Sequence, residues 1–223
     1  MNSLSQLLIF QPLYNILAAL CIFLKGNFGG AVLILAALIR LAIWPWYGSA
    51  MKSQRKLAVL QPKMKILQKK FKADPTQANK EIMKLFREEK LNPFGSFFFI
   101  FVQMAIFIIL YIFFTQALKT DWSTYLYPII SGVPILNYTF LTINLRTPSL
   151  ILALISALLN SVMTFVQPKV GQNRLMIMSL PFIILLFYKR FPAVILLYWV
   201  GITLVSIVQE ILIAREAKSS PEK

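Results

Sequence analysis

The stretch that decides the fold is AVLILAALIRLAIWPW, residues 31–46, which is apolar except for Arg40. A helix that spans a bilayer needs about 20 mostly apolar residues, and this run is nearly that long. A charge at bilayer depth costs about 2.5–3.5 kcal/mol even on the mildest insertion scale. We therefore expect Arg40 to face a protein-lined or water-filled space and to mark a functional site.

The composition of the whole chain also indicates a membrane protein. Of the 223 residues, 58% are hydrophobic and 14% are charged, which is more apolar surface than a soluble domain of this size buries. The chain has a net charge of +15, one Cys and no His. One Cys excludes a disulfide framework, and the lack of His argues against structural zinc and removes the commonest general base. We expect no cofactor or metal.

Five apolar runs are predicted to cross the membrane as helices. Four of them have the ~17–25 residues that a span tolerates. The fourth in chain order contains Pro181 and would cover only about 21 Å of a ~30 Å hydrocarbon core. The predicted fold class is an all-α integral membrane protein with five transmembrane helices. The predicted spans are residues 29–46, 97–115, 148–166, 175–188 and 193–213.

The distribution of Lys and Arg predicts the orientation of these helices. Residues 47–96 carry twelve of the 23, so the positive-inside rule places this segment in the cytoplasm. With five spans, 17 of these side chains lie inside and five outside, with the N-terminus outside and the C-terminus inside. An additional span at residues 125–143 would weaken the split to 15 against 7. Two prolines and a glycine interrupt that stretch, which we expect to be an outer loop at the interface.

The remaining segments complete the predicted domain organisation. Residues 1–27 are expected to hold an extra-cytoplasmic helix that lies in the membrane interface, because polar residues and a proline punctuate its apolar run. A sixth span there is the alternative. The core is predicted at residues 28–213, and residues 214–223 are expected to form a short basic cytoplasmic tail.

Residues 47–96 are predicted to form a cytoplasmic hairpin of two antiparallel helices. Asp74 can cap the second helix, with Pro75 at its first position and Gln77 completing a capping box. Pro62 is expected to kink the first helix or to mark its start. The basic face is expected to lie near anionic lipid headgroups, with a specific docking role as the alternative. Heptad spacing predicts an apolar seam of Leu57, Leu60, Met64, Leu67 and Phe71 against Ala78, Ile82, Leu85 and Phe86.

Polar side chains within the spans predict a hydrophilic groove around Arg40. Each must find a partner or water, and a shared wet space open to the cytoplasm and closed outside satisfies them most simply. Ordinary interhelical hydrogen bonding is the alternative, and we prefer it for Ser156 or Thr203 taken alone. A second alternative is that Arg40 pairs with Glu210 and only holds two helices together. The candidate groove residues are Arg40, Gln103, Asn160, Thr164, Gln167, Thr203, Ser206 and Glu210.

In the order of its motifs, the chain resembles the YidC insertases of bacteria and their mitochondrial and chloroplast relatives. Ile39-Arg40-Leu41, followed by Pro45, looks like the end of the first core span of that family, with its groove arginine. Further similar motifs are FQPLYN at 10–15, LQPK at 60–63, EKLNPFG at 89–95, VQMAIF at 102–107, and FP at 191–192 with LYW at 197–199.

The resemblance implies insertion and folding of membrane proteins in the bacterial inner membrane, alone or with the Sec translocon. Polar, often acidic, segments of nascent membrane proteins would cross through the groove with Arg40 as a transient partner, without covalent chemistry. The Sec translocon and the ribosome are implied partners, and no specific nucleic acid is expected. A non-catalytic assembly factor of a distant insertase branch, or a small transporter or channel, remains an alternative. An intramembrane enzyme, which would need a nucleophile and base or metal ligands, is disfavoured because the chain has no His, its one Cys lies outside the predicted spans, and no span contains Asp.

Overall fold

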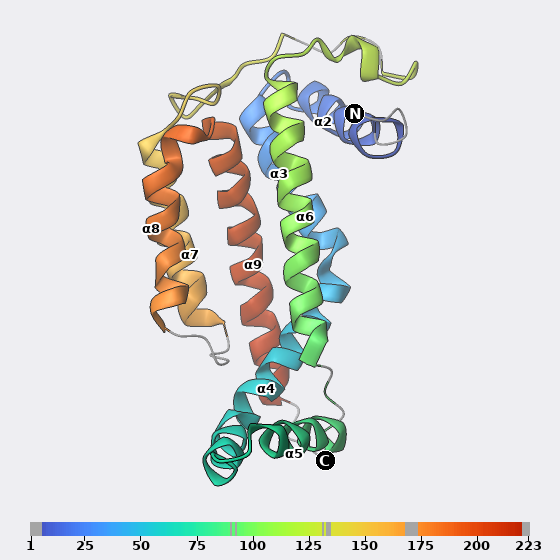
Figure 1. The fold of residues 1–223 in the computed structure, drawn as a ribbon. Helices are drawn as coiled ribbons and strands as arrows, with labels where there is room; N and C mark the ends of the chain where they lie inside the picture. Colours follow the sequence, from blue (N-terminus) through green and yellow to red (C-terminus); the bar gives the residue numbers. More distant parts are fainter. Residues whose placement is uncertain are drawn as a thin grey trace.

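The computed structural model describes residues 6–219 except 90, 92, 131, 133, 134 and 168–173. Most of the described chain is helical, which confirms the predicted all-α class (Figure 1). In chain order the elements are the π-helix η1 (Gln6–Phe10), α2 (Gln11–Phe23), α3 (Phe28–Ala42), α4 (Trp44–Lys70), α5 (Pro75–Glu88), α6 (Pro93–Ala117), the 3-10 helix η2 (Trp122–Tyr125), β1 (Thr139–Phe140), β2 (Ile143–Asn144), α7 (Leu150–Val166), α8 (Arg174–Phe187), the 3-10 helix η3 (Tyr188–Arg190) and α9 (Ala193–Ser219).

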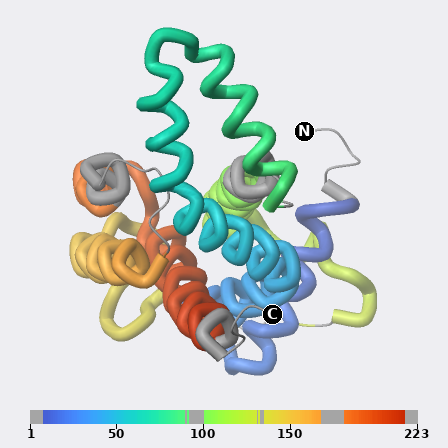
Figure 2. Tube along the Cα trace, turned by 90° about the horizontal axis from the view of Figure 1, so that it is seen from below, coloured from blue at the N-terminus to red at the C-terminus, as the bar shows by residue number. Residues whose placement is uncertain are grey.

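Helices α3, α6, α7, α8 and α9 run lengthwise through the molecule, and α9 is central among them (Figure 1). Helix α9 packs against α3 on one side and α7 on the other, and α8 packs against α7. Helix α2 lies across one end, beside the connection from α6 to α7, and we call this the loop end. The α4–α5 hairpin lies at the opposite end and projects sideways from the bundle, as Figure 2 shows from below. We call this the hairpin end.

Length and hydropathy identify fewer spans than the sequence predicted. Within the described part of the chain, residues Ala193–Arg215 of α9 are long and apolar enough to cross a membrane. Helices α3 and α4 meet the same criterion only when taken together, and they are bent by 62°. The apolar stretches Leu8–Phe23, Phe101–Ala117 and Leu150–Val166 are shorter. The five-span layout therefore stays a prediction.

The first predicted span differs from the structure at its end. It was expected to continue to residue 46, but α3 ends at Ala42 and a new helix begins at Trp44. Pro45 occupies the first turn of α4, where its missing N–H costs nothing and where it favours a new start over a continuing helix. Arg40 therefore lies in the last turn of α3 and not six residues inside a longer helix.

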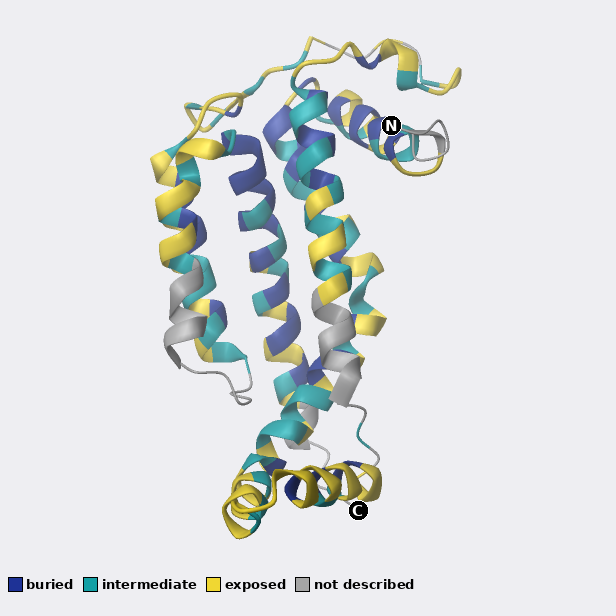
Figure 3. Ribbon diagram, viewed as in Figure 1, coloured by how far each residue is buried: buried dark blue, intermediate teal, exposed yellow. Residues whose placement is uncertain are grey.

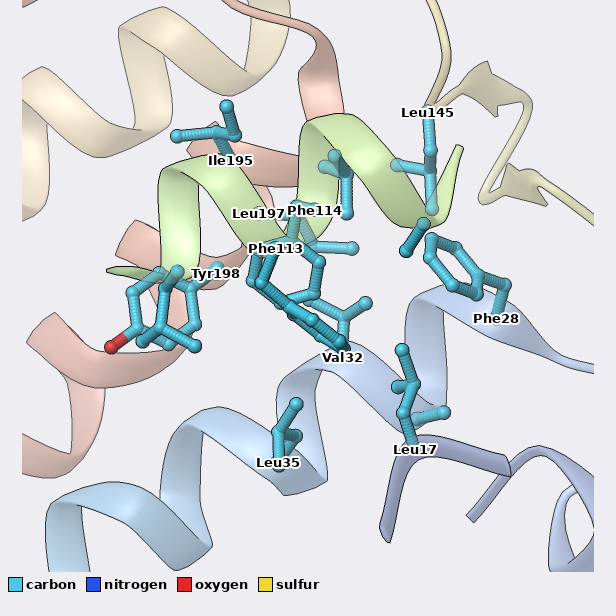
Figure 4. Close-up of a cluster of buried hydrophobic side chains, with 14 of the residues drawn as sticks. Leu17, Phe28, Val32, Leu35, Phe113, Phe114, Leu145, Ile195, Leu197 and Tyr198 are labelled. Atoms are coloured by element: carbon cyan, nitrogen blue, oxygen red, sulfur yellow. The ribbon is translucent and has the colours of Figure 1, made fainter. Parts of the chain in front are cut away.

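The main apolar core includes residues of the loop end, such as Tyr14, Leu17 and Trp122. Val32 and Leu35 of α3 pack in this core with Phe113 and Phe114 of α6 and with Leu197 of α9 (Figure 4). Figure 3 shows that α9 is buried along most of its length, whereas the outer faces of α7 and α8 are exposed. Those outer faces carry large apolar side chains, as expected for surfaces that contact lipid: Leu154, Leu158, Phe165, Phe182 and Leu186.

A glycine allows α3 and α9 to approach closely. A Cβ atom added to Gly201 would lie 3.0 Å from the Cβ of Ala36 and 3.2 Å from the Cδ2 of Leu33. Small residues at such crossings are the usual means by which membrane helices pack, because lipid supplies no hydrophobic force between them. This contact sets the rotation of α9 against α3, and Arg40 lies one turn further along α3.

The loop end is held by polar and aromatic contacts. Asn15 of α2 donates to the backbone oxygen of Tyr125 at 2.9 Å and accepts from the Tyr127 amide at 2.7 Å. Tyr14 stacks on Tyr125 with ring centroids 4.7 Å apart. After Tyr125, the last residue of η2, the described residues of the 125–143 stretch are irregular backbone that ends in the antiparallel β1–β2 pair, so the stretch does not form a spanning helix.

The hairpin has the predicted cap and part of the predicted seam. Asp74 accepts a hydrogen bond from the Gln77 amide at 3.0 Å, and Pro75 is in the first turn of α5. Helix α4 runs through Pro62, so this proline does not mark its start. The buried residues of the seam are Leu60, Ala78, Ile82 and Phe86, while Leu57, Met64, Leu67, Phe71 and Leu85 are half-buried. The opposite faces of both helices are exposed (Figure 3).

Candidate functional site

Arg40 is buried at the hairpin-end half of the α3–α9 contact, with 5% of its surface exposed. Its Nε donates to the side-chain oxygen of Gln209 on α9 at 2.8 Å. The Gln209 amide in turn lies 3.5 Å from the backbone oxygen of Arg40. The guanidinium also lies over the ring of Tyr47, 3.8 Å from its centroid, in a cation–π contact. These direct partners are neutral, and the Glu210 carboxylate, which also acts on Arg40 electrostatically, is paired with Arg55.

One further predicted residue lies beside Arg40. Gln103 of α6 and Arg40 line the same small pocket, together with Tyr198 of α9. The rest of the lining is aliphatic: Ile39, Ile43, Ile106 and Ile202. Charge and hydrogen-bonding groups therefore share a mostly apolar space between three helices.

Glu210 lies in a second cluster, toward the hairpin. Its side chain is fully buried and forms an ion pair with Arg55 of α4. The Tyr47 hydroxyl donates to the other carboxylate oxygen at 3.3 Å. Gln167, after the end of α7, hydrogen-bonds to the same tyrosine. Tyr47 thus joins the two clusters, with its ring against Arg40 and its hydroxyl on Glu210.

The sequence alternative in which Arg40 pairs with Glu210 does not describe the hydrogen bonds in the structure. Arg40 bonds to Gln209, and the ion pair of Glu210 is with Arg55. Neighbouring residues on a helix point about 100° apart. Gln209 therefore faces α3 while Glu210 faces α4.

The polar stripe of α7 is satisfied mainly within its own helix. The Asn160 side chain donates to the Ser156 backbone oxygen at 2.8 Å, and the Thr164 hydroxyl donates to that of Asn160 at 2.8 Å. Both residues are half-buried. Ser156 is buried and donates to the Leu196 backbone oxygen of α9 at 3.3 Å, an interhelical bond of the ordinary kind. A groove shared by this stripe and Arg40 stays a prediction.

The two predicted hydroxyls of α9 are buried. Ser206 donates to the backbone oxygen of Ile202, one turn earlier in the same helix, and Thr203 lies on the buried side between them. That these two hydroxyls line a groove with Arg40 stays a prediction.

Three residues of these clusters were not among the candidate groove residues: Gln209, Tyr47 and Arg55. Gln209 carried a signal, because it stands beside Glu210 in an apolar helix. Tyr47 is seven residues after Arg40, and the helix break between them hid its direction. Arg55 was one of twelve basic residues in its segment, and nothing in the spacing separated it from the others.

The chemistry available at this site is electrostatic. It offers a cation, amides and phenols in an apolar setting, where charge interactions are stronger than in water. In the part of the chain that the structure describes, no group of three His, Cys, Asp or Glu side chains could hold a metal ion.

Comparisons with known proteins agree with the motifs. The family model "60Kd inner membrane protein" matches residues 20–220. "Membrane protein insertase YidC" of Cupriavidus taiwanensis is 33% identical over 204 residues, covering 90% of this chain and 34% of that protein. The protein of the same name from Burkholderia ambifaria is 29% identical over 213 residues, covering 94% and 36%. The chain thus spans about a third of the length of these curated relatives. The resemblance expected from the motifs is confirmed, and the chain belongs to the 60Kd inner membrane protein family.

Proposed function

We propose that this chain inserts nascent membrane proteins into the bacterial inner membrane. The observation that carries the proposal is Arg40, a buried cation held by the neutral partners Gln209 and Tyr47. The names of the relatives support the same activity. A site that keeps a net positive charge inside an apolar bundle is suited to bind an acidic segment of a passing chain. The Sec translocon and the ribosome are included as proposed partners.

The proposed substrate path is a groove open to the hairpin end. Arg40 and Gln103 supply one wall, and Asn160, Thr164, Gln167, Thr203 and Ser206 supply polar surface on α7 and α9. A water-filled groove that is open on one side of the membrane and closed on the other shortens the apolar barrier that a polar segment must cross. The apolar part of the substrate then leaves sideways into lipid. In this scheme Glu210 holds Tyr47 and the hairpin in place and does not contact the substrate.

The function can be tested by rescue of a bacterium depleted of its own insertase. We expect expression of this chain to restore insertion of a small single-span reporter. The measurement is protease protection of the reporter after a pulse label. The matched control is the Gly201→Leu variant, whose larger side chain meets Ala36 and Leu33 and should separate α3 from α9. Insertion that stays at the level of the empty vector would contradict the proposal.

The proposed topology has five spans, the N-terminus outside, and the hairpin and C-terminus in the cytoplasm. The twelve basic side chains of residues 47–96 support it. In a Cys21→Ser background, a cysteine at Lys65 on the exposed face of the hairpin should be shielded from an impermeant label added outside. A cysteine at Ile135, which is 98% exposed at the loop end, should be labelled. The reverse labelling pattern would invert the orientation.

A further inference from the structure

Four basic side chains meet around one pocket at the loop end of the bundle. The pocket has a volume of about 430 Å³ and lies where α6 ends and where η3 connects α8 to α9. Lys119 follows α6, Arg146 precedes α7, and Lys189 and Arg190 belong to η3. Three separate parts of the chain therefore bring positive charge to the same hollow, which we call the loop-end pocket.

Among the described residues that line this pocket there is no carboxylate. The sequence has only two carboxylates between residues 97 and 213, Asp121 and Glu210. Asp121 lines a different pocket and accepts two hydrogen bonds from Ser123. Glu210 is paired with Arg55 at the hairpin end. Like charges so gathered repel one another, and an anion between them would relieve that repulsion.

The wall of the pocket is apolar and aromatic. Tyr111 of α6 and Phe191 lie edge to face in it, with ring centroids 5.9 Å apart, and Leu118 and Pro192 add aliphatic surface. Arg146 lines the pocket, and its guanidinium also rests over the ring of Tyr138, 3.9 Å from the ring centroid. A phosphate with an apolar body attached matches both kinds of surface, and Arg and Lys are the side chains that bind phosphate.

This cluster of basic side chains is also not what the positive-inside rule predicts for the loop end. In the proposed topology the loop end is outside, and positive charge is normally kept on the inner side of a membrane. Single Lys and Arg side chains at helix ends reach the interface by extending their stems. That explains isolated cations but not four of them around one aromatic pocket.

We propose that the loop-end pocket binds the phosphate group of an anionic phospholipid, with the lipid glycerol and acyl chains against Tyr111 and Phe191. This goes beyond the proposed insertase function and does not depend on it. The site lies at the opposite end of the bundle from Arg40, and it would anchor the outer ends of α6 and α8 to the lipid leaflet around them.

The test is lipid binding by native mass spectrometry of the purified chain, with phosphatidylglycerol as the probe. The variant Lys119→Gln/Lys189→Gln/Arg190→Gln removes three charges and keeps Arg146 on its tyrosine. The control Lys65→Gln/Lys69→Gln/Lys80→Gln removes three exposed charges from the hairpin, whose basic face is expected to be attracted to a charged bilayer surface as a whole and not to hold a single lipid on the purified chain. We expect phosphatidylglycerol affinity to fall roughly tenfold or more in the pocket variant and less than about twofold in the control. A charge-conserving Lys119→Arg/Lys189→Arg variant should bind as the parent does.

Two further arms identify the source of the phosphate. Phosphatidylcholine, which has a phosphate but no net charge, should bind weakly to the parent and lose little in the pocket variant. Inorganic phosphate at millimolar concentration should not displace phosphatidylglycerol, because it lacks the apolar body. Equal loss in the pocket and hairpin variants would overturn the proposal, as would displacement by inorganic phosphate. No insertion reaction enters these measurements, so their failure leaves the proposed function standing.

Discussion

Replacing Arg40 with alanine should nearly abolish insertion of a reporter whose translocated segment is acidic, while Arg40→Lys should retain it. Removing one partner of a buried charge pair costs about 2–5 kcal/mol, which corresponds to a rate at least roughly 30-fold lower. Lysine keeps the charge on a compact head, although it loses the planar contact with Tyr47. The measurement is the initial rate of reporter insertion in cells depleted of their own insertase. A reporter with a neutral translocated segment should tolerate both variants.

The hydrogen bond to Gln209 offers a sharper control. Gln209→Glu leaves Arg40 in place but puts a carboxylate where a neutral oxygen lies 2.8 Å from its Nε. The carboxylate on α9 would then neutralise the arginine on α3, and insertion of the acidic reporter should slow as it does in Arg40→Ala. If acidic and neutral reporters lose insertion equally in both variants, Arg40 has a structural role only and the proposed mechanism is wrong.

The prominence of Arg40 could be predicted because one charge in an apolar run is a local signal. The apolar runs likewise predicted that helices exist and roughly where they lie, since hydrophobicity along the chain is enough for that. The cap at Asp74 was predictable for the same reason, because its partner Gln77 is three residues away. Each of these features depends on residues close together in sequence.

The partner of Arg40 could not be predicted in this way. The choice between Gln209 and Glu210 depends on how α9 is rotated against α3, and the close approach at Gly201 sets that rotation. The direction of Tyr47 depends on the break after Ala42, which turns the next helix by 62°. The Arg55–Glu210 pair joins residues 155 apart in sequence. Such contacts follow from packing of whole helices and have no signal in local spacing.

Glu210→Gln should destabilise the fold and loosen the hairpin, with no dependence on the charge of the substrate. The carboxylate is fully buried and is shared by Arg55 and the Tyr47 hydroxyl. Its loss leaves Arg55 without this counter-charge, and the Nε of that arginine already has no hydrogen-bond partner among the residues that the structure describes. Breaking a buried pair costs about 3–5 kcal/mol. Since Arg55 is 24% exposed and can turn toward water, we expect a smaller loss of about 1–3 kcal/mol.

The chain supplies a matched control for this loss in its exposed Lys63–Glu89 pair, with 3.9 Å between charged atoms. Glu89→Gln is the same chemical change at a solvated site and should alter stability by less than ~1 kcal/mol. Thermal unfolding in detergent measures both variants, and hydrogen exchange of α4 reports whether the hairpin detaches. Equal stability of the two variants would show that the Glu210 pair does not hold α4 on α9.

The double variant Arg55→Met/Glu210→Leu should recover much of the stability that Glu210→Gln loses, because an apolar pair of similar volume leaves no charge unpaired. The double variant leaves the charge on Arg40 untouched. If it recovers stability and inserts the acidic reporter normally, then the Arg55–Glu210 pair has a structural role that is distinct from the functional charge of Arg40.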